Sequence, residues 1–286
     1  MIDAAVRRFD AFFLTEAQET FEEDRNRLRL RLDTDYIEHH GWEFSPRVKV
    51  NFHLPGLGER VRLVVNDAGG DEEDEGVELE DDENDVALRW VARKGKKTGI
   101  SVDGGVSFRG GEVDPFVRVN TSYKYRISEN WRGQATNRLY YLARNGWRDD
   151  LRIYFNRPIG ERFLFRSRSR LEYFEDKDSN PQLEQKFSLF QNISDRSAIA
   201  YEAIWRQDTA EDSIYDDEEI LIGPRDKYQQ VKLRIRYRRN FWRPWMFVEF
   251  WPVVGWVEER DWDTVLGARM RLEINFGWHA GSKLDE

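Results

Sequence analysis

The sequence has no cysteine and only four histidines, and these shortages set several kinds of protein aside. Without cysteine, the 286-residue chain has neither a disulfide framework nor a thiolate metal site. No apolar run approaches the ~18 residues that a membrane-spanning helix requires. Intrinsic disorder is equally excluded, because 18 Phe, 11 Tyr and 11 Trp are far more aromatic surface than unfolded chains carry.

Basic residues are missing from two runs in which the acidic residues are concentrated. Asp71 to Asp85 holds eleven acids, and Asp208 to Glu219 holds seven. The chain has a net charge of -9, so without these two runs the remainder has a net charge of +9. Such runs are typical of solvated loops. They lack the ligand spacing of an EF-hand, so we expect no cofactor and at most loose binding of divalent cations.

The dominant periodicity is two residues, which predicts β-strands with one polar and one apolar face. It is strict over Arg27–Leu32, Arg47–Leu54 and Val231–Arg238. The same pattern predicts about fourteen strands, with twelve as the alternative count: 27–38, 44–54, 59–66, 85–94, 98–109, 115–127, 133–145, 150–157, 161–174, 183–193, 196–207, 228–239, 244–257 and 264–278.

Two features inside these strands predict local irregularity. Pro252 cannot donate a ladder hydrogen bond, so we expect a bulge or a kink there. Gly104 and Gly105 predict either a bulge or a point of close packing, since glycine has no side chain.

The connections between the predicted strands alternate in length. Short turns such as Gly95–Lys97 and Ser128–Asn130 form one set, and both acidic runs belong to the other set. An up-and-down meander places every second connection at the same end, and short turns opposite longer loops are typical of outer-membrane barrels. Many strands have ten or more residues, matching the ~9–11 that cross a bilayer at a tilt.

Aromatic residues near the strand ends favour a membrane barrel over a soluble sheet. Trp42, Trp131, Trp147, Trp242 and Trp262 lie near predicted ends, as in interfacial aromatic girdles. A closed barrel also removes the edges that so many alternating strands would otherwise expose. We therefore predict an all-β, transmembrane, antiparallel up-and-down β-barrel.

Residues 25–278 resemble Gram-negative outer-membrane β-barrel proteins, most specifically in the final segment Leu266–Trp278, which ends in an aromatic residue. The resemblance implies a porin-like transport role in the outer membrane, after removal of a signal peptide that this chain lacks. It also implies contact with lipid, with lipopolysaccharide and with the barrel-insertion machinery. Residues 279–286 form a tail that departs from the usual ending.

The first 24 residues differ from the remainder of the chain. Val6, Phe9, Phe13 and Ala17 recur at helical spacing, which predicts a short amphipathic helix. Because Asp3 and Asp10 interrupt it, this segment is not a signal peptide. We expect residues 1–24 to form either a periplasmic segment, which would anchor a periplasmic partner, or a plug.

If the apolar rows face lipid, the polar rows face the interior, where the expected residues are mainly basic. We predict that the following residues line it: Arg29, Arg31, Lys49, Arg118, Lys124, Arg126, Arg152, Arg166, Arg168, Arg170, Lys232, Arg234, Arg236, Glu249, Arg269, Arg271 and Glu273. Fixed positive charge would favour small anionic solutes in an open pore. Alternatively, these arginines pair with acidic residues and fill a plugged interior. Inward acids are expected to be fewer than the bases: Glu172, Glu184, Glu202, Glu249 and Glu273.

No catalytic or metal-binding motif accompanies the strands. None of His39, His40, His53 and His279 has a serine or aspartate at the spacing used by barrel phospholipases or proteases. The basic rows lie on alternating strands, without the context of nucleic-acid binding. The leading hypothesis is therefore a channel; the alternatives are an occluded docking barrel and, with less support, a lipid-modifying enzyme such as a lipid hydrolase.

Overall fold

The computed structural model describes Phe9, residues 12–13, 27–38, 41–54, 60–67, 83–95, 97–109, 112–175, 181–208, 213–215, 221–224, 229–258 and 261–276. Within these residues, no helix has the length and the apolar composition to cross a membrane. Most of the N-terminal segment 1–24, for which a helix is predicted, lies outside the described residues, as do most of the two acidic runs, His39, His40 and the tail over 279–286.

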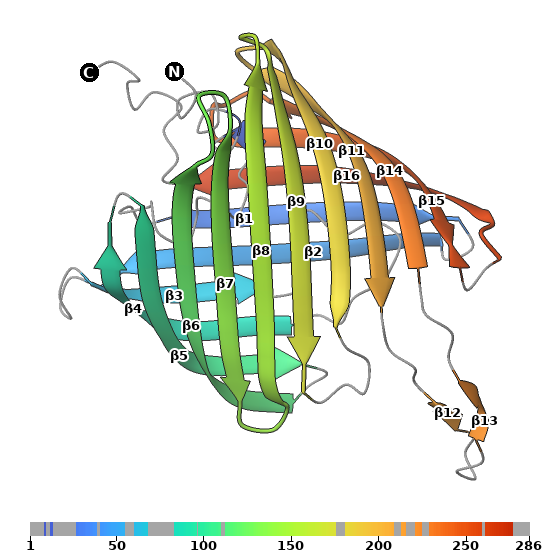
Figure 1. The fold of residues 1–286 in the computed structure, drawn as a ribbon. Helices are drawn as coiled ribbons and strands as arrows, with labels where there is room; N and C mark the ends of the chain where they lie inside the picture. Colours follow the sequence, from blue (N-terminus) through green and yellow to red (C-terminus); the bar gives the residue numbers. More distant parts are fainter. Residues whose placement is uncertain are drawn as a thin grey trace.

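Fourteen antiparallel strands form one closed barrel (Figure 1). Its first half consists of β1 (Arg27–Ile37), β2 (Gly41–His53), β3 (Val61–Asp67), β4 (Glu83–Lys94), β5 (Thr98–Arg109), β6 (Glu112–Arg126) and β7 (Arg132–Leu142). The second half consists of β8 (Gly146–Ile159), β9 (Phe163–Phe174), β10 (Gln182–Ser194), β11 (Ser197–Asp208), β14 (Gln229–Asn240), β15 (Met246–Val257) and β16 (Thr264–Phe276). The predicted count of fourteen is confirmed, and the alternative of twelve is wrong.

The strands follow chain order around the barrel, and β1 closes it by pairing with β16. Because consecutive strands run in opposite directions, the β3–β4 and β11–β14 connections leave at the same rim, as the alternation of short and long connections predicts. The connection between β11 and β14 is more than the expected loop, because it contains a separate two-stranded sheet (Figure 1). Its strand β12 (Ser213–Tyr215) lies within the second acidic run, and β13 (Leu221–Pro224) follows that run.

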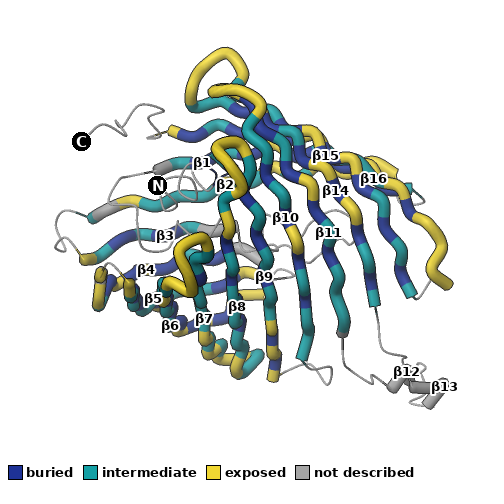
Figure 2. Tube along the Cα trace, turned by 45° about the horizontal axis from the view of Figure 1, so that its top comes forward, coloured by how far each residue is buried: buried dark blue, intermediate teal, exposed yellow. Residues whose placement is uncertain are grey.

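Burial alternates along the strands with the predicted period of two (Figure 2). On β14, Arg234 and Arg236 are buried whereas Leu233 and Ile235 are exposed. Side chains of the buried rows also contact strands that are not adjacent: Arg238 on β14 passes β15 to donate to Glu273 on β16, at 2.7 Å. Side chains converge in this way only on the concave side, so the buried rows face the interior.

Pro252 and Gly105 have consequences that differ partly from the predictions. The β14–β15 ladder stops after Arg234↔Val253 and resumes at Tyr237↔Phe250 in unchanged register, so Pro252 interrupts pairing without making a bulge. Gly105 marks a close approach: a Cβ there would lie 2.1 Å from the Val86 carbonyl oxygen. The nearby bulge falls on β4, between Val91 and Arg93.

The outward rows are apolar and exposed, as a lipid-facing surface requires. Val117, Leu266 and Met270 are more than half exposed, and Trp42 and Trp242 at strand ends reach 73% and 80%. The outward polar group of Ser167, Gln185 and Ser169 is satisfied internally, since Ser169 donates to Gln185 at 2.6 Å and Gln185 donates to Ser167 at 2.9 Å. Such pairing lowers the cost of polar groups in hydrocarbon.

Candidate functional site

The barrel interior is the candidate site, and most residues predicted to line it are buried on the concave face. Lys49, Lys124 and Arg170 are partly exposed, and Arg126 is exposed near a turn. The predicted residues that are buried are Arg29, Arg31, Arg118, Arg152, Arg166, Arg168, Lys232, Arg234, Arg236, Glu249, Arg269, Arg271 and Glu273. Their role in a pore stays a prediction.

Two adjacent ion pairs fasten the seam between the first and last strands. The register sets Asp33 opposite Arg271 and Asp35 opposite Arg269. Each arginine donates to both carboxylate oxygens, Arg271 at 2.6 and 2.9 Å and Arg269 at 2.5 and 2.9 Å. Bidentate pairs combine geometric specificity with strong hydrogen bonds, so they fix the register in which the barrel closes.

Glu202 on β11 is the centre of a buried cluster of bases. Arg234 donates to Glu202 at 2.7 Å, and ion pairs join Glu202 to Arg236 at 3.3 Å and to Lys186 at 3.5 Å. All four residues are at most 4% exposed. Glu202 thus has a base on each of the two neighbouring strands, β10 and β14.

Trp251 lies beside this cluster and is fully buried. Its indole Nε1 donates to Glu249 at 2.6 Å. Four guanidinium carbons lie 4.6–5.3 Å from its ring centroid, those of Arg234, Arg236, Arg269 and Arg271. An aromatic face attracts cations at this separation, so Trp251 helps to hold arginines of β14 and β16 together.

A second charged network joins β4, β5 and β6. Asp103 accepts two hydrogen bonds from Arg89, at 2.8 and 2.9 Å, and one from Arg118 at 2.8 Å. Arg118 also donates to Asp85 on β4 at 3.0 Å. The two acids balance the two arginines, and all four side chains are buried.

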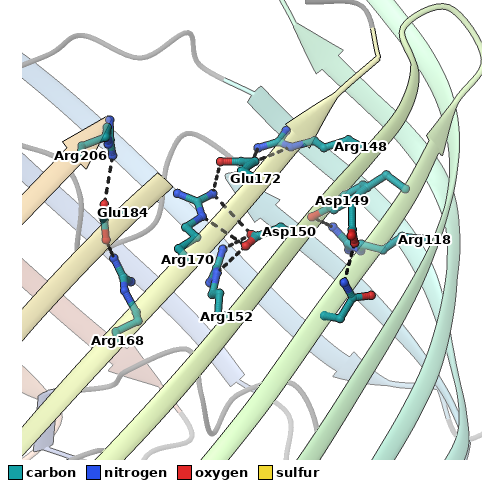
Figure 3. A network of polar contacts seen from close by, with 12 residues as sticks. Arg118, Arg148, Asp149, Asp150, Arg152, Arg168, Arg170, Glu172, Glu184 and Arg206 are labelled. Carbon is teal, nitrogen blue, oxygen red and sulfur yellow. Dashed lines mark hydrogen bonds and ion pairs between the residues drawn. The ribbon is translucent and has the colours of Figure 1, made fainter. Parts of the chain in front are cut away.

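A third network crosses β8, β9, β10 and β11 (Figure 3). Asp150 accepts from Arg152 at 2.9 Å and from Arg170 at 3.2 Å. Glu172 extends the chain of contacts, through an ion pair with Arg170 at 2.7 Å and a hydrogen bond from Arg148 at 2.9 Å. Farther along the wall, Glu184 accepts from Arg168 and from Arg206.

The interior holds more acids than the five that the alternation predicted, although among the buried residues they are still fewer than the bases. Besides Glu172, Glu184, Glu202, Glu249 and Glu273, the buried interior acids are Asp33, Asp35, Asp85, Asp103, Asp114 and Asp150. A signal for some of them was present, because the alternation that points Arg29 and Arg31 inward continues to Asp33 and Asp35 on the same strand. Attention to basic rows alone missed them.

Solvent nevertheless contacts bases more than acids along the interior. The acids named above are at most 6% exposed. By contrast, the partly exposed charged side chains that the structure describes in the interior rows are basic: Arg47, Lys49, Lys124, Arg132, Arg138, Arg148, Arg170 and Arg206. Glu43, near the start of β2, and Glu112, at the start of β6, are exposed acids of the same rows.

Phe9 and Phe13, ahead of the barrel, are buried among interior side chains. They belong to an apolar cluster with Leu164 on β9, Phe190 on β10, and Ala198 and Ala200 on β11. The rings of Phe9 and Phe13 lie 6.0 and 5.0 Å from that of Phe190. These contacts agree with a plug, although residues 1–8, 10–11 and 14–26 are outside the described part of the chain.

The described residues do not assemble a metal site. Among them, no group of three or more His, Asp or Glu is placed to hold a metal ion. His53 lies on β2, but its side chain is not described. The chemistry that the interior offers is thus electrostatic attraction and binding by arginine donors.

The solved structures that are similar to this chain are outer-membrane β-barrels. No protein family and no curated protein matches. The CymD monoaromatic hydrocarbon channel has a TM-score of 0.55 at 10% identity, covering 94% of this chain and 93% of that chain. A bacterial polysaccharide outer membrane secretin has a TM-score of 0.50 at 13% identity, covering 88% of this chain and 99% of that chain. At these identities the likeness shows the fold: a closed barrel shared with outer-membrane channels.

Proposed function

We propose that this chain is an outer-membrane channel for small solutes, placed in a Gram-negative outer membrane with its apolar rows against lipid. The closed barrel, its exposed apolar surface and its fold likeness to channels support this proposal. In water, exposed apolar area on this scale would promote association. A folded barrel should run differently in cold and in boiled SDS samples, and identical mobility would count against the membrane assignment.

We further propose that the channel prefers anions. The observation that carries this is the difference in exposure: of the described interior acids all but Glu43 and Glu112 are buried behind their partners, whereas Arg47, Lys49 and Arg138 are partly exposed. A permeating ion interacts most strongly with charges that solvent reaches, because protein atoms separate it from the buried ones. A positive interior surface concentrates anions and repels cations.

The test is the reversal potential of purified protein in a planar bilayer under a potassium chloride gradient. We expect a chloride-to-potassium permeability ratio above one that falls in the double variant Lys49→Gln and Arg138→Gln. The fall should be larger at low salt, where screening is weak. Arg144→Gln, at the rim, is the matched control and should leave the ratio unchanged. A cation-selective native protein would refute the anion preference.

A second candidate is the occluded docking barrel. The specific observation in its favour is that interior ion pairs and the buried Phe9 and Phe13 fill much of the described interior. Under this proposal the native protein shows no conductance. Charge reversal at Arg234 and Arg236 would then place like charges beside Glu202 and destabilise the barrel. The two similar structures are named as a hydrocarbon channel and a polysaccharide secretin, which supports a non-enzymatic role and favours the channel.

A further inference from the structure

One part of the interior is apolar where its surroundings are charged. Leu164, Phe190, Ala198 and Ala200 occupy interior positions of β9, β10 and β11, and all are at most 2% exposed. The next interior positions along the same strands are charged or polar: Arg166, Ser188 and Glu202. A water-filled wall gains nothing from such a patch. Ala198 and Ala200 have small side chains on the interior face of β11, and the ring of Phe13 packs in the same cluster.

Arg236 borders this patch and has two donor groups without a hydrogen-bond partner among the described residues. It is 3% exposed, and its guanidinium carbon lies 5.1 Å from the Phe13 ring centroid and 5.2 Å from that of Trp251. The ion pair with Glu202 at 3.3 Å does not amount to a hydrogen bond, and Nε and Nη2 have no hydrogen-bond partner in the described structure. Buried donors without acceptors are costly.

The strand ladder also opens at this point. The β14–β15 pairing is interrupted between Arg234↔Val253 and Tyr237↔Phe250, the stretch that contains Arg236 and Trp251. Pro252 explains the interruption, because it has no N–H to donate. Arg236 therefore lies where the ladder to β15 is interrupted, while its pairing with Ala200 on β11 is kept.

We propose that the apolar patch and Arg236 form an interior binding site for a small anion that carries an apolar ring, and that Phe13 occupies the place of that ring. The ring of the ligand would pack on Ala198, Ala200 and Phe190. Its carboxylate would accept hydrogen bonds from Nε and Nη2 of Arg236, a geometry that suits a planar guanidinium. Lys186 and Arg234 would continue to neutralise Glu202.

The consequence is competition between the solute and the N-terminal phenylalanine. This inference rests on the proposed anion channel, because a solute must reach the interior to displace Phe13. While Phe13 occupies the patch, the solute binds with reduced apparent affinity, and removal of the Phe13 ring should restore the intrinsic affinity of the site.

The first experiment measures binding of phenylacetate to purified full-length protein in detergent by calorimetry. We expect Phe13→Ala to tighten binding by about tenfold. Acetate, which lacks the ring, and benzyl alcohol, which lacks the charge, should bind much more weakly to the same variant. Adding Arg236→Lys to the Phe13→Ala variant keeps the positive charge but removes the two parallel donors of the guanidinium. It should therefore abolish the tenfold increase in phenylacetate affinity. Arg144→Lys, at the rim, is the matched control and should preserve it.

The second experiment uses the absence of cysteine. In the variant Phe13→Cys with Ala200→Cys, the engineered thiols are the only two in the chain, so disulfide formation reports that residue 13 lies on the patch. Phenylacetate should slow this cross-link severalfold, and acetate should not. Cross-linking that is insensitive to phenylacetate, or equal affinity in native and Phe13→Ala proteins, would overturn the proposal.

These outcomes separate the site from the channel. Binding and competition without ionic conductance would retain the site and reject the channel. Anion conductance without phenylacetate binding would retain the channel and reject the site. If Arg236→Lys does not fold, as judged by its mobility in cold SDS, Ala200→Leu replaces it, because the added side chain would fill the place of the ring.

Discussion

The interior rows of β16 and β7 are both polar, yet only one of them is buried. On β16, Arg269, Arg271, Glu273 and Asn275 are at most 5% exposed. On β7, Gln134, Thr136, Arg138 and Tyr140 all remain partly exposed. The two rows therefore differ in their surroundings more than in their own composition.

The neighbouring strands account for this difference. β16 lies between Asp33 and Asp35 on β1 and Glu249 on β15, so each of its arginines has an opposed carboxylate. On β7, the register sets Arg138 opposite Asp150, but Arg152 and Arg170 already donate to that acid. A charge can leave water only when it is paired, so the supply of acids decides which wall is packed and which contacts solvent.

The largest effect is expected from removing one acid of the packed wall. Asp33→Ala leaves Arg271 buried beside Arg31 and Arg269, and should cost roughly 3–5 kcal/mol of unfolding free energy. Urea unfolding in detergent, followed by Trp fluorescence, measures this loss. Thr136→Ala on β7 is the control, with little change expected. Equal unfolding midpoints in the two variants would remove the distinction between the walls.

Removing both members of the same pair should cost less than removing the acid alone. In the double variant Asp33→Leu with Arg271→Leu no unpaired charge stays buried at the seam, so apolar packing replaces the ion pair. The double-mutant cycle with the two single variants gives the coupling energy, expected in the range of about 0.5–3 kcal/mol. An additive result would show that the pair does not couple the strands.

Adding an acid to the partly exposed wall of β7 should make its balance of acids and bases more like that of the buried wall of β16. Thr136→Glu on β7 faces Arg152 in the register and lies two residues from Arg138. We expect the chloride-to-potassium permeability ratio to fall while unfolding free energy changes by less than about 0.5 kcal/mol, as for accessible sites. Thr136→Gln, similar in size and uncharged, should leave the ratio unchanged. An increased ratio would contradict the electrostatic argument.

The smallest effect is expected at the rim. Arg144 and Glu112 pair at 2.8 Å, but their side chains are 57% and 72% exposed. Such pairs contribute about 0–1 kcal/mol, and solvent screening places this one at the low end. Arg144→Ala should thus leave the urea midpoint nearly unchanged. A loss comparable with that of Asp33→Ala would show that exposure is a poor guide to pair strength in this barrel.

Much of the barrel could be predicted because its determinants are local. The alternation of Arg27–Leu32 and Val231–Arg238 gave the strands and their orientation, and the expected ranges match the fourteen barrel strands closely. The hairpin of β12 and β13 was missed, since the acidic residues around it mask any alternation. Of the bulge or kink predicted at Pro252, the bulge is absent, because a strand can lose a donor without changing its register.

The sequence by itself determined the strand number, the meander order and which face of each strand is polar, because a period of two fixes side-chain direction residue by residue. Only the tertiary structure decided which charges pair. Asp33 and Arg271 are 238 residues apart, and Arg238 reaches Glu273 across an intervening strand. Those contacts depend on barrel closure and on the register between strands. No local pattern encodes them, so neither the packed wall nor the site beside Phe13 could be inferred before the strands were in place.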